Sequence, residues 1–200
     1  NGDAAQRMKD MGLIYNMNYG VSLLNIKEFL KTVPQNQELA LKLWNEPLRE
    51  TKLFALYLFE PAKCDSIFIH SLLNSLQNTE LAEQAAWSVF CYSQLSQETL
   101  LDWCRDDSQT VKLAGYNTII RKLKTGNMPQ FDFGVFFDTL HHEIETDAVL
   151  PQKSVSFALT EIARKGNKPL VEQFVQKIET INTKQSRFIV DNVNNELEYL

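Results

Sequence analysis

Residues 109–120 read QTVKLAGYNTII: the stretch begins with polar side chains, carries Lys112 in its first turn, and then places small and apolar residues at helical spacing. Residues 50–58 (ETKLFALYL) and 152–162 (QKSVSFALTEI) follow the same plan. Residues 81–92 also fit, with Glu83 at the position of the lysine. The chain therefore repeats one type of amphipathic helix.

The spacing of these helices indicates how they are arranged. They start about 30 to 40 residues apart, which is the length of one helix pair per repeat. Such pairs bury their apolar faces against neighbouring pairs and stack into a curved array with a concave surface. We therefore predict an all-α fold, a HEAT-like repeat solenoid of antiparallel helix pairs that forms an α-α superhelix. A non-repeating helical bundle is the alternative.

Helical periodicity, capping residues and prolines set the expected helix boundaries. The predicted helices span residues 3–12, 21–33, 36–45, 47–59, 65–77, 80–93, 96–106, 109–123, 131–145, 150–165, 168–182 and 185–198. The expected N-caps are Asn36, Asp65, Ser96 and Ser108. The prolines expected to open helices are Pro47, Pro151 and Pro169. We expect a single domain over residues 1–200, with about six helix pairs and a C-terminal capping helix at 185–200.

Composition narrows the class of protein. Hydrophobic residues make up 44% of the 200 residues, which is typical of a packed core and excludes a disordered chain. The 7 glycines and 6 prolines are too few for a collagen-like or many-turned all-β chain. The formal net charge of −5 argues against a non-specific nucleic-acid coat protein, although one basic face on an acidic protein would still bind phosphates.

The cysteines and the apolar runs bear on the compartment. Cys64, Cys91 and Cys104 are an odd number and do not form a disulfide framework, which favours a reducing cytoplasm. There is no run of about 18 apolar residues, so no transmembrane helix and no membrane partner is expected. Residues 1–10 also lack the apolar core of a signal peptide.

Several segments carry a more specific signal through their order and spacing. They are YGVS at 19–22, LALKLW at 39–44, the helix at 50–58, VKLAGY at 111–116, and VSFAL at 155–159. Together they resemble the DNA alkylation repair family, the HEAT-like-repeat alkylpurine DNA glycosylases of the AlkD type. The similarity spans roughly residues 13 to 170, most of the chain.

This resemblance implies a chemistry on damaged DNA. The family removes cationic N3- or N7-alkylpurines while holding duplex DNA against a concave basic face. The alkylated purine is already a good leaving group, so a carboxylate that stabilises the positive sugar supplies much of the catalysis. Aromatic rings in the family favour the cation, and an arginine holds a backbone phosphate.

The family's functional positions fall on named residues of this chain. Its stretch W-D-x-x-D-Q matches TELAEQ at residues 79–84, which puts Glu83 at the catalytic carboxylate and Thr79 at the first tryptophan. Leu113 stands at the arginine of V-K-R-A-G, and Phe157 stands at the later tryptophan. The resemblance thus implies that Glu83 stabilises the sugar cation and that Phe157 lies against the lesion. The structural alternative for Glu83 is a first-turn acid favoured by the helix dipole.

Basic residues are concentrated in two segments, 109–125 and 150–169, separated by an acidic segment. The candidate DNA-backbone contacts are Lys112, Arg121, Lys122, Lys124, Lys153, Arg164, Lys165 and Lys168. If both segments line one concave face, these side chains would follow phosphates. The alternative is that they are ordinary basic C-terminal ends of helices.

Other motifs support no further chemistry. Asp138 and His142 are four residues apart, but two ligands do not make a metal site, and a solvated helix end is expected there. The tryptophans Trp44, Trp87 and Trp103 are expected in the core.

We therefore expect a DNA glycosylase-like repair protein with duplex DNA as its partner, no cofactor and no metal. The alternative is a non-catalytic HEAT-repeat scaffold that binds DNA or a protein partner through the same surface.

Overall fold

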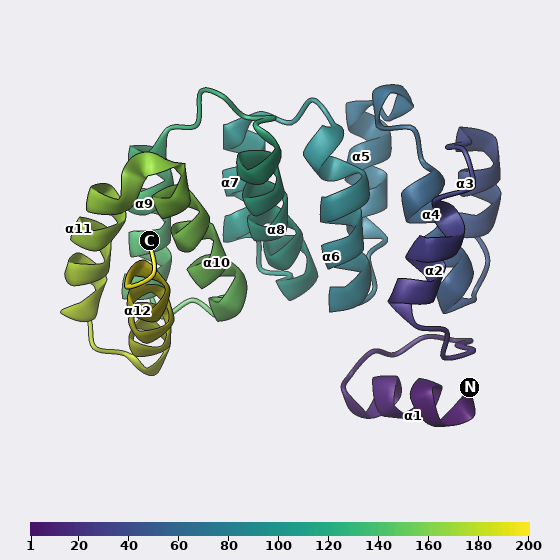
Figure 1. Cartoon of the computed structure of the whole chain (residues 1–200), viewed down its shortest axis with the longest axis horizontal. Coiled ribbons are helices and arrows are strands. Elements are labelled where there is room, and N and C mark those ends of the chain that lie inside the picture. The colour runs from purple at the N-terminus through teal and green to yellow at the C-terminus, as the bar shows by residue number, and fades with distance from the viewer. The chain divides into compact units, whose positions relative to one another are not determined.

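The computed structural model describes residues 1–200, which divide into two compact units, Asn1–Ser93 and Gln94–Leu200. It contains twelve α-helices and three short helical segments (Figure 1). The only β-type pairing is an isolated bridge between Met17 and Leu48. The all-α prediction is confirmed, and each of the twelve predicted ranges overlaps one α-helix. None of the helices combines the length and apolar character needed to cross a membrane.

The first unit is built around α4. Its elements are α1 (Gly2–Asp10), α2 (Leu23–Leu30), α3 (Gln37–Trp44), α4 (Arg49–Leu58), η1 (Pro61–Lys63), α5 (Ser66–Asn74), α6 (Thr79–Ser88) and η2 (Phe90–Tyr92). Helix α4 packs against α2, α3 and α6. Leu53 and Leu56 of α4 and Leu81 of α6 are fully buried there, because the apolar side of each helix removes its surface from water at the shared core.

The second unit contains α7 (Gln97–Arg105), α8 (Gln109–Thr125), α9 (Phe133–Glu145), α10 (Gln152–Ile162), η3 (Ala163–Asn167), α11 (Lys168–Glu179) and α12 (Lys184–Leu197). Helix α8 packs on α7 and on α10, and α10 packs on α12 (Figure 1). Helix α9 contacts α7 and α11. Within this unit, α8, α10 and α12 thus follow one another in one layer and α7, α9 and α11 in another, as successive HEAT-like helix pairs do. The single-domain organisation stays a prediction.

Helix α8 contains the longest unbroken run of buried residues, and its glycine explains how closely it packs. Every residue from Val111 to Ile120 is buried. A Cβ atom on Gly115 would lie 3.0 Å from the backbone nitrogen of Cys104 and 3.0 Å from the Cβ of Trp103, both on α7. Only glycine allows the two backbones to approach this closely.

Glutamines near helix starts connect neighbouring elements through their side-chain amides. In α7, Gln97 donates to the carbonyl of Asp132 at 2.7 Å and accepts from its backbone N–H at 2.8 Å. In α12, Gln185 donates to the carbonyl of Ala148 and accepts from the N–H of Leu150. These bonds satisfy backbone groups of the connections before α9 and α10, and so fix the connections to the following helices.

Most of the predicted helix starts are confirmed in atomic detail. The side chains of Asn36, Asp65 and Ser96 each accept a hydrogen bond from a first-turn backbone N–H. Ser108 occupies the N-cap position of α8 but makes no such bond, and its hydroxyl pairs with that of Thr110.

Several helix boundaries differ from the prediction by two residues or more. The helix predicted over 80–93 ends at Ser88, since Val89 leaves helical geometry and η2 follows. Pro151 is the N-cap of α10 and Pro169 lies in the first turn of α11, whereas α4 starts two residues after Pro47.

Candidate functional site

Helix α6 presents a narrow exposed face in the first unit. Thr79, Glu83 and Trp87 are spaced four residues apart, and all three are exposed. The opposite side of the helix is fully buried through Leu81 and Ala85. The structure thus places an indole one turn beyond Glu83, on the same side of the helix.

Trp87 corrects an expectation about the tryptophans. Trp103 is buried as predicted and Trp44 is half-buried, but 37% of the surface of Trp87 remains exposed. The four-residue interval between Glu83 and Trp87 is the feature of the sequence that places this indole on the exposed face of the helix. Trp87 thus places an aromatic ring two turns beyond Thr79 on the same face of α6.

The carboxyl group of Glu83 is in an environment that disfavours its charge. Partial burial raises its pKa above that of an ordinary glutamate, and the negative charge of Glu80 raises the pKa further. No ion pair is formed by Glu83. An exposed carboxylate without a cationic partner is free to stabilise a positive charge on a ligand.

A buried polar cluster, formed by Tyr15, Arg49, Glu50, Asn78 and Glu80, holds the start of α6. The guanidinium of Arg49 donates to Glu80 twice, from Nε at 2.8 Å and from Nη2 at 2.6 Å. The hydroxyl of Tyr15 donates to Glu80 at 2.7 Å and to Asn78, the N-cap of α6, at 3.1 Å. The first turn of α6 is thereby connected to the N-terminal part of the chain and to α4.

The same cluster organises the segment YGVS at residues 19–22. The carboxylate of Glu50 accepts from the backbone N–H groups of Tyr19 and Val21 at 3.2 and 3.1 Å. Arg49 Nη1 donates to the carbonyl of Val21 at 2.7 Å. Burial opposes the charge of Arg49, but Glu80 and Glu50 outweigh burial and raise its pKa. Sequence reasoning missed this cluster, because its partners lie about 30 residues apart and only the charged pair Arg49-Glu50 within an apolar helix gave a signal.

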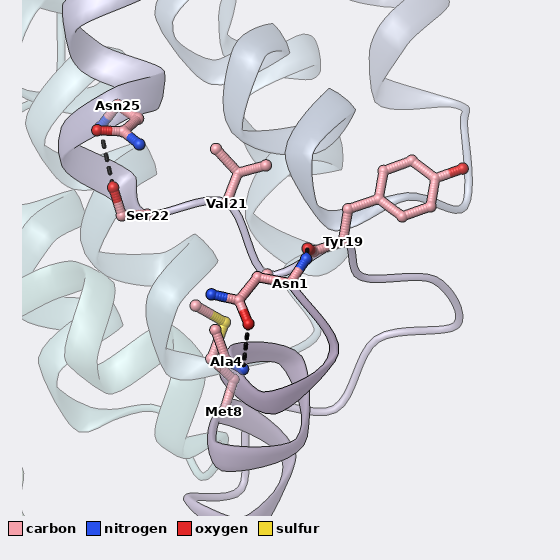
Figure 2. A pocket seen from close by; sticks show the side chains of 8 residues that line it. Asn1, Ala4, Met8, Tyr19, Val21, Ser22 and Asn25 are labelled. Carbon is pink, nitrogen blue, oxygen red and sulfur yellow. Dashed lines mark hydrogen bonds between the residues drawn. The ribbon is translucent and has the colours of Figure 1, made fainter.

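A pocket of about 390 Å³ lies between α1 and the segment that leads into α2 (Figure 2). Ala4, Met8 and Val21 give it a mainly apolar lining, and the ring of Tyr19 points away from it. Gly20, at a φ of 69°, allows α1 to approach, because a Cβ there would clash with the carbonyl oxygen of Asn1. Its lining contains no Asp, Glu, His, Lys, Arg or Cys side chain, so no charged side chain faces a ligand there.

The sequence predicts that Lys112 contacts the DNA backbone, but in the second unit its side chain is buried and not available to DNA. Its side chain is 5% exposed, and its Nζ lies 2.7 Å from Glu143 Oε2. A buried ammonium requires a paired carboxylate, and this pairing connects α8 to α9. The proposed phosphate contact by Lys112 is therefore corrected to a packing role. Lys122 is also buried, at 3% exposure.

The other candidate cations lie nearer to solvent. Lys124, Lys153, Arg164 and Lys165 are exposed, whereas Arg121 and Lys168 are half-buried. Arg164 pairs with Glu196 at 2.7 Å. Lys168 donates to the carbonyl of Leu197 at 2.8 Å. The left-handed Gly166, at a φ of 89°, ends the α-helical backbone directly after Arg164 and Lys165, so these two also lie at a helix C-terminus.

The two remaining family positions of this unit have opposite environments. Leu113 is buried at 8% exposure, so it packs rather than meeting a ligand. Phe157 is 58% exposed although its neighbours Ser156 and Ala158 are buried. It lies with Lys153 in a groove of about 410 Å³ between α10 and α12.

The structure contains no group of three or more metal-ligating side chains. Asp138 and His142 are exposed on α9, and neighbouring His141 lies 3.3 Å from Glu145. The functional groups that the exposed candidate residues present are therefore a carboxylate, aromatic rings and cations.

These observations define an all-α protein of successive helix pairs that exposes a carboxylate beside an aromatic ring. The chain belongs to the DNA alkylation repair enzyme family, whose family model matches residues 3–191. No curated protein and no solved structure matches the chain significantly.

Proposed function

We propose that the protein removes N3- or N7-alkylated purines from duplex DNA by hydrolysing the N-glycosidic bond. The observation that carries this proposal is Glu83, an exposed carboxylate without an ion-pair partner in a member of a DNA alkylation repair family. A cationic alkylpurine leaves as a neutral base, taking the electron pair of the glycosidic bond. The positive charge then moves to the sugar, where the carboxylate of Glu83 stabilises it. Water adds to the sugar carbon and releases a proton to solvent.

Aromatic side chains support the recognition of a cationic base. Trp87 and Phe157 are both exposed, at 37% and 58%, and a cation is attracted to the face of an aromatic ring. In the proposed reaction Trp87 supplies the ring beside Glu83 in place of Thr79, and Phe157 contacts the modified DNA. Neither role needs a metal or an organic cofactor.

Exposed cations account for the proposed binding of the DNA backbone. We assign phosphate contacts to Lys124, Lys153, Arg164, Lys165 and, at the half-buried positions, Arg121 and Lys168. Each phosphate contact releases condensed counterions, so affinity for the duplex should fall steeply as salt rises.

The test is base release from a duplex methylated at random positions. Wild-type protein is expected to release 3-methyladenine or 7-methylguanine faster than a protein-free control, as measured by chromatography of the free bases. Release at the protein-free rate for both bases would reject the glycosylase.

A second candidate is a non-catalytic scaffold that binds DNA or a protein partner. It is favoured by Leu113, which is buried where the family has an arginine, and by Thr79, which lacks a ring. Salt-dependent binding of duplex DNA without base release would support a DNA scaffold. If the affinity for duplex DNA does not fall as salt rises, phosphate contacts do not hold the DNA, and this result would point to a protein partner.

A further inference from the structure

The groove between α10 and α12 has one aromatic wall. Phe157 contributes an exposed ring from α10, flanked by Ser156 and Thr160. The hydroxyls of Ser156 and Thr160 donate to backbone carbonyls one turn earlier, at 2.9 Å each. They therefore have no donor left for a ligand, and the ring dominates this side of the groove.

The opposite wall, from α12, is polar, and its side-chain groups that lack a partner in the protein are uncharged. The side chain of Asn195 makes no hydrogen bond with the protein, so both its amide donor and its acceptor are available. Asn192 donates to the carbonyl of Phe188 at 2.7 Å but keeps its side-chain oxygen free. Glu196 also lines the groove, and Arg164 neutralises its charge.

One free cation completes the groove. Lys153 lies one turn before Phe157 on α10, is exposed, and has no ion-pair partner. The groove thus combines a ring for stacking, an amide that both donates and accepts, and an ammonium group. Its volume of about 410 Å³ is within the usual range for sites that bind small organic groups.

We infer that this groove binds one unpaired nucleobase of a DNA strand, stacked on Phe157, with its edge at Asn195 and its phosphate at Lys153. Stacking on an aromatic ring and hydrogen bonding by an asparagine amide are the two means by which proteins hold an exposed base. The inference rests on the proposed function, since that supplies DNA as the ligand. It adds that the protein prefers DNA with a base outside the helical stack, and that α12 contributes to this preference.

The test compares two labelled duplexes of equal length by fluorescence anisotropy, one fully paired and one with a single bulged adenine. Wild-type protein is expected to bind the bulged duplex about tenfold more tightly, the effect of one stacked base. Phe157→Ala and Asn195→Ala should remove this preference, so that each variant binds the bulged and the paired duplex with equal affinity. Phe157→Trp should keep it. Asn194→Ala is the matched control, because Asn194 is an exposed neighbour on α12 that does not line the groove.

The outcomes separate this inference from the proposed function. Salt-dependent binding of both duplexes with equal affinity would overturn the groove inference alone. A preference for the bulge that survives in Phe157→Ala and Asn195→Ala would also overturn it. Failure to bind either duplex would contradict the proposed DNA ligand itself, and the inference with it.

Discussion

Lys112 Nζ and Glu143 Oε2 lie 2.7 Å apart, and their side chains are only 5% and 10% exposed. This ion pair joins α8 to α9 inside the second unit. A lysine that the sequence suggests as a DNA contact is therefore a structural element of the core.

Truncating either partner of this pair should destabilise the protein. Lys112→Met leaves the carboxylate of Glu143 buried without a counter-charge, which costs about 3–5 kcal/mol of unfolding free energy. The double variant Lys112→Met/Glu143→Leu should recover most of this loss, since it removes both charges. Chemical denaturation measures the unfolding free energies of the wild type, the single variant and the double variant. A single variant as stable as the wild type would contradict the burial of the pair.

The cluster around Arg49 makes a parallel prediction for the first unit. Arg49→Ala leaves Glu80 and Glu50 without their cation, and should cost about 3–5 kcal/mol. Tyr15→Phe removes one hydroxyl that donates to Glu80, and should cost about 1–3 kcal/mol because a charged acceptor is involved. Urea denaturation tests both. A smaller loss in Arg49→Ala than in Tyr15→Phe would show that the guanidinium does not organise the cluster.

The raised pKa of Glu83 predicts how activity depends on pH. The ionised carboxylate is the active form, so the rate of base release should fall as the pH drops through the pKa of Glu83. Because burial and Glu80 both raise this pKa, the fall should be centred above the pKa of about 4.3 of an ordinary glutamate. A pH–rate profile of single-turnover release checks this, and a midpoint at or below the ordinary value would contradict it.

The raised pKa of Glu83 also predicts that replacing this residue stabilises the protein, whereas most substitutions destabilise a protein. A carboxyl with a raised folded-state pKa is destabilising when ionised, and this cost is absent below its unfolded-state pKa. Glu83→Gln should therefore raise the melting temperature near neutral pH, and the gain should vanish near pH 4. Equal gains at both pH values would exclude an electrostatic origin.

Trp87 can be tested independently of Glu83. If its ring supports a cationic base, Trp87→Phe should keep most of the base release, and Trp87→Leu should slow it about tenfold, for roughly 1–2 kcal/mol of cation–π interaction. The matched control is Tyr92→Leu, which removes another exposed aromatic side chain of the same unit. Equal rates for Trp87→Leu and the wild type would assign the ring to packing alone.

The helices could be predicted from the sequence because local signals determine them. Polar starts, capping residues such as Asn36 and Asp65, and a 3.6-residue apolar period identify each helix without knowledge of its neighbours. The site was less predictable, because burial depends on which helices pack together. Lys112 reads as a surface lysine until Glu143 is brought to it from 31 residues away. Trp87 reads as a core residue until the exposed face of α6 is known.

The family positions show the same limit. The sequence identifies Glu83 and Phe157 as the side chains that keep a charge and a ring, and the structure finds both exposed. It does not identify Asn195, because an asparagine in a polar C-terminal helix has no distinguishing neighbours in sequence. Its importance arises only from the packing of α12 against α10.

The most direct test of the proposed chemistry is single-turnover release of 7-methylguanine from a duplex that holds it at one defined site. Wild type should be compared with Glu83→Gln and with Glu98→Gln, which changes an exposed first-turn acid of α7. We predict equal rates for wild type and Glu98→Gln, and a rate about 100-fold lower for Glu83→Gln at unchanged duplex affinity. Release by Glu83→Gln at the wild-type rate, or by the wild type at the rate of DNA alone, would contradict the assignment of Glu83 as the catalytic carboxylate.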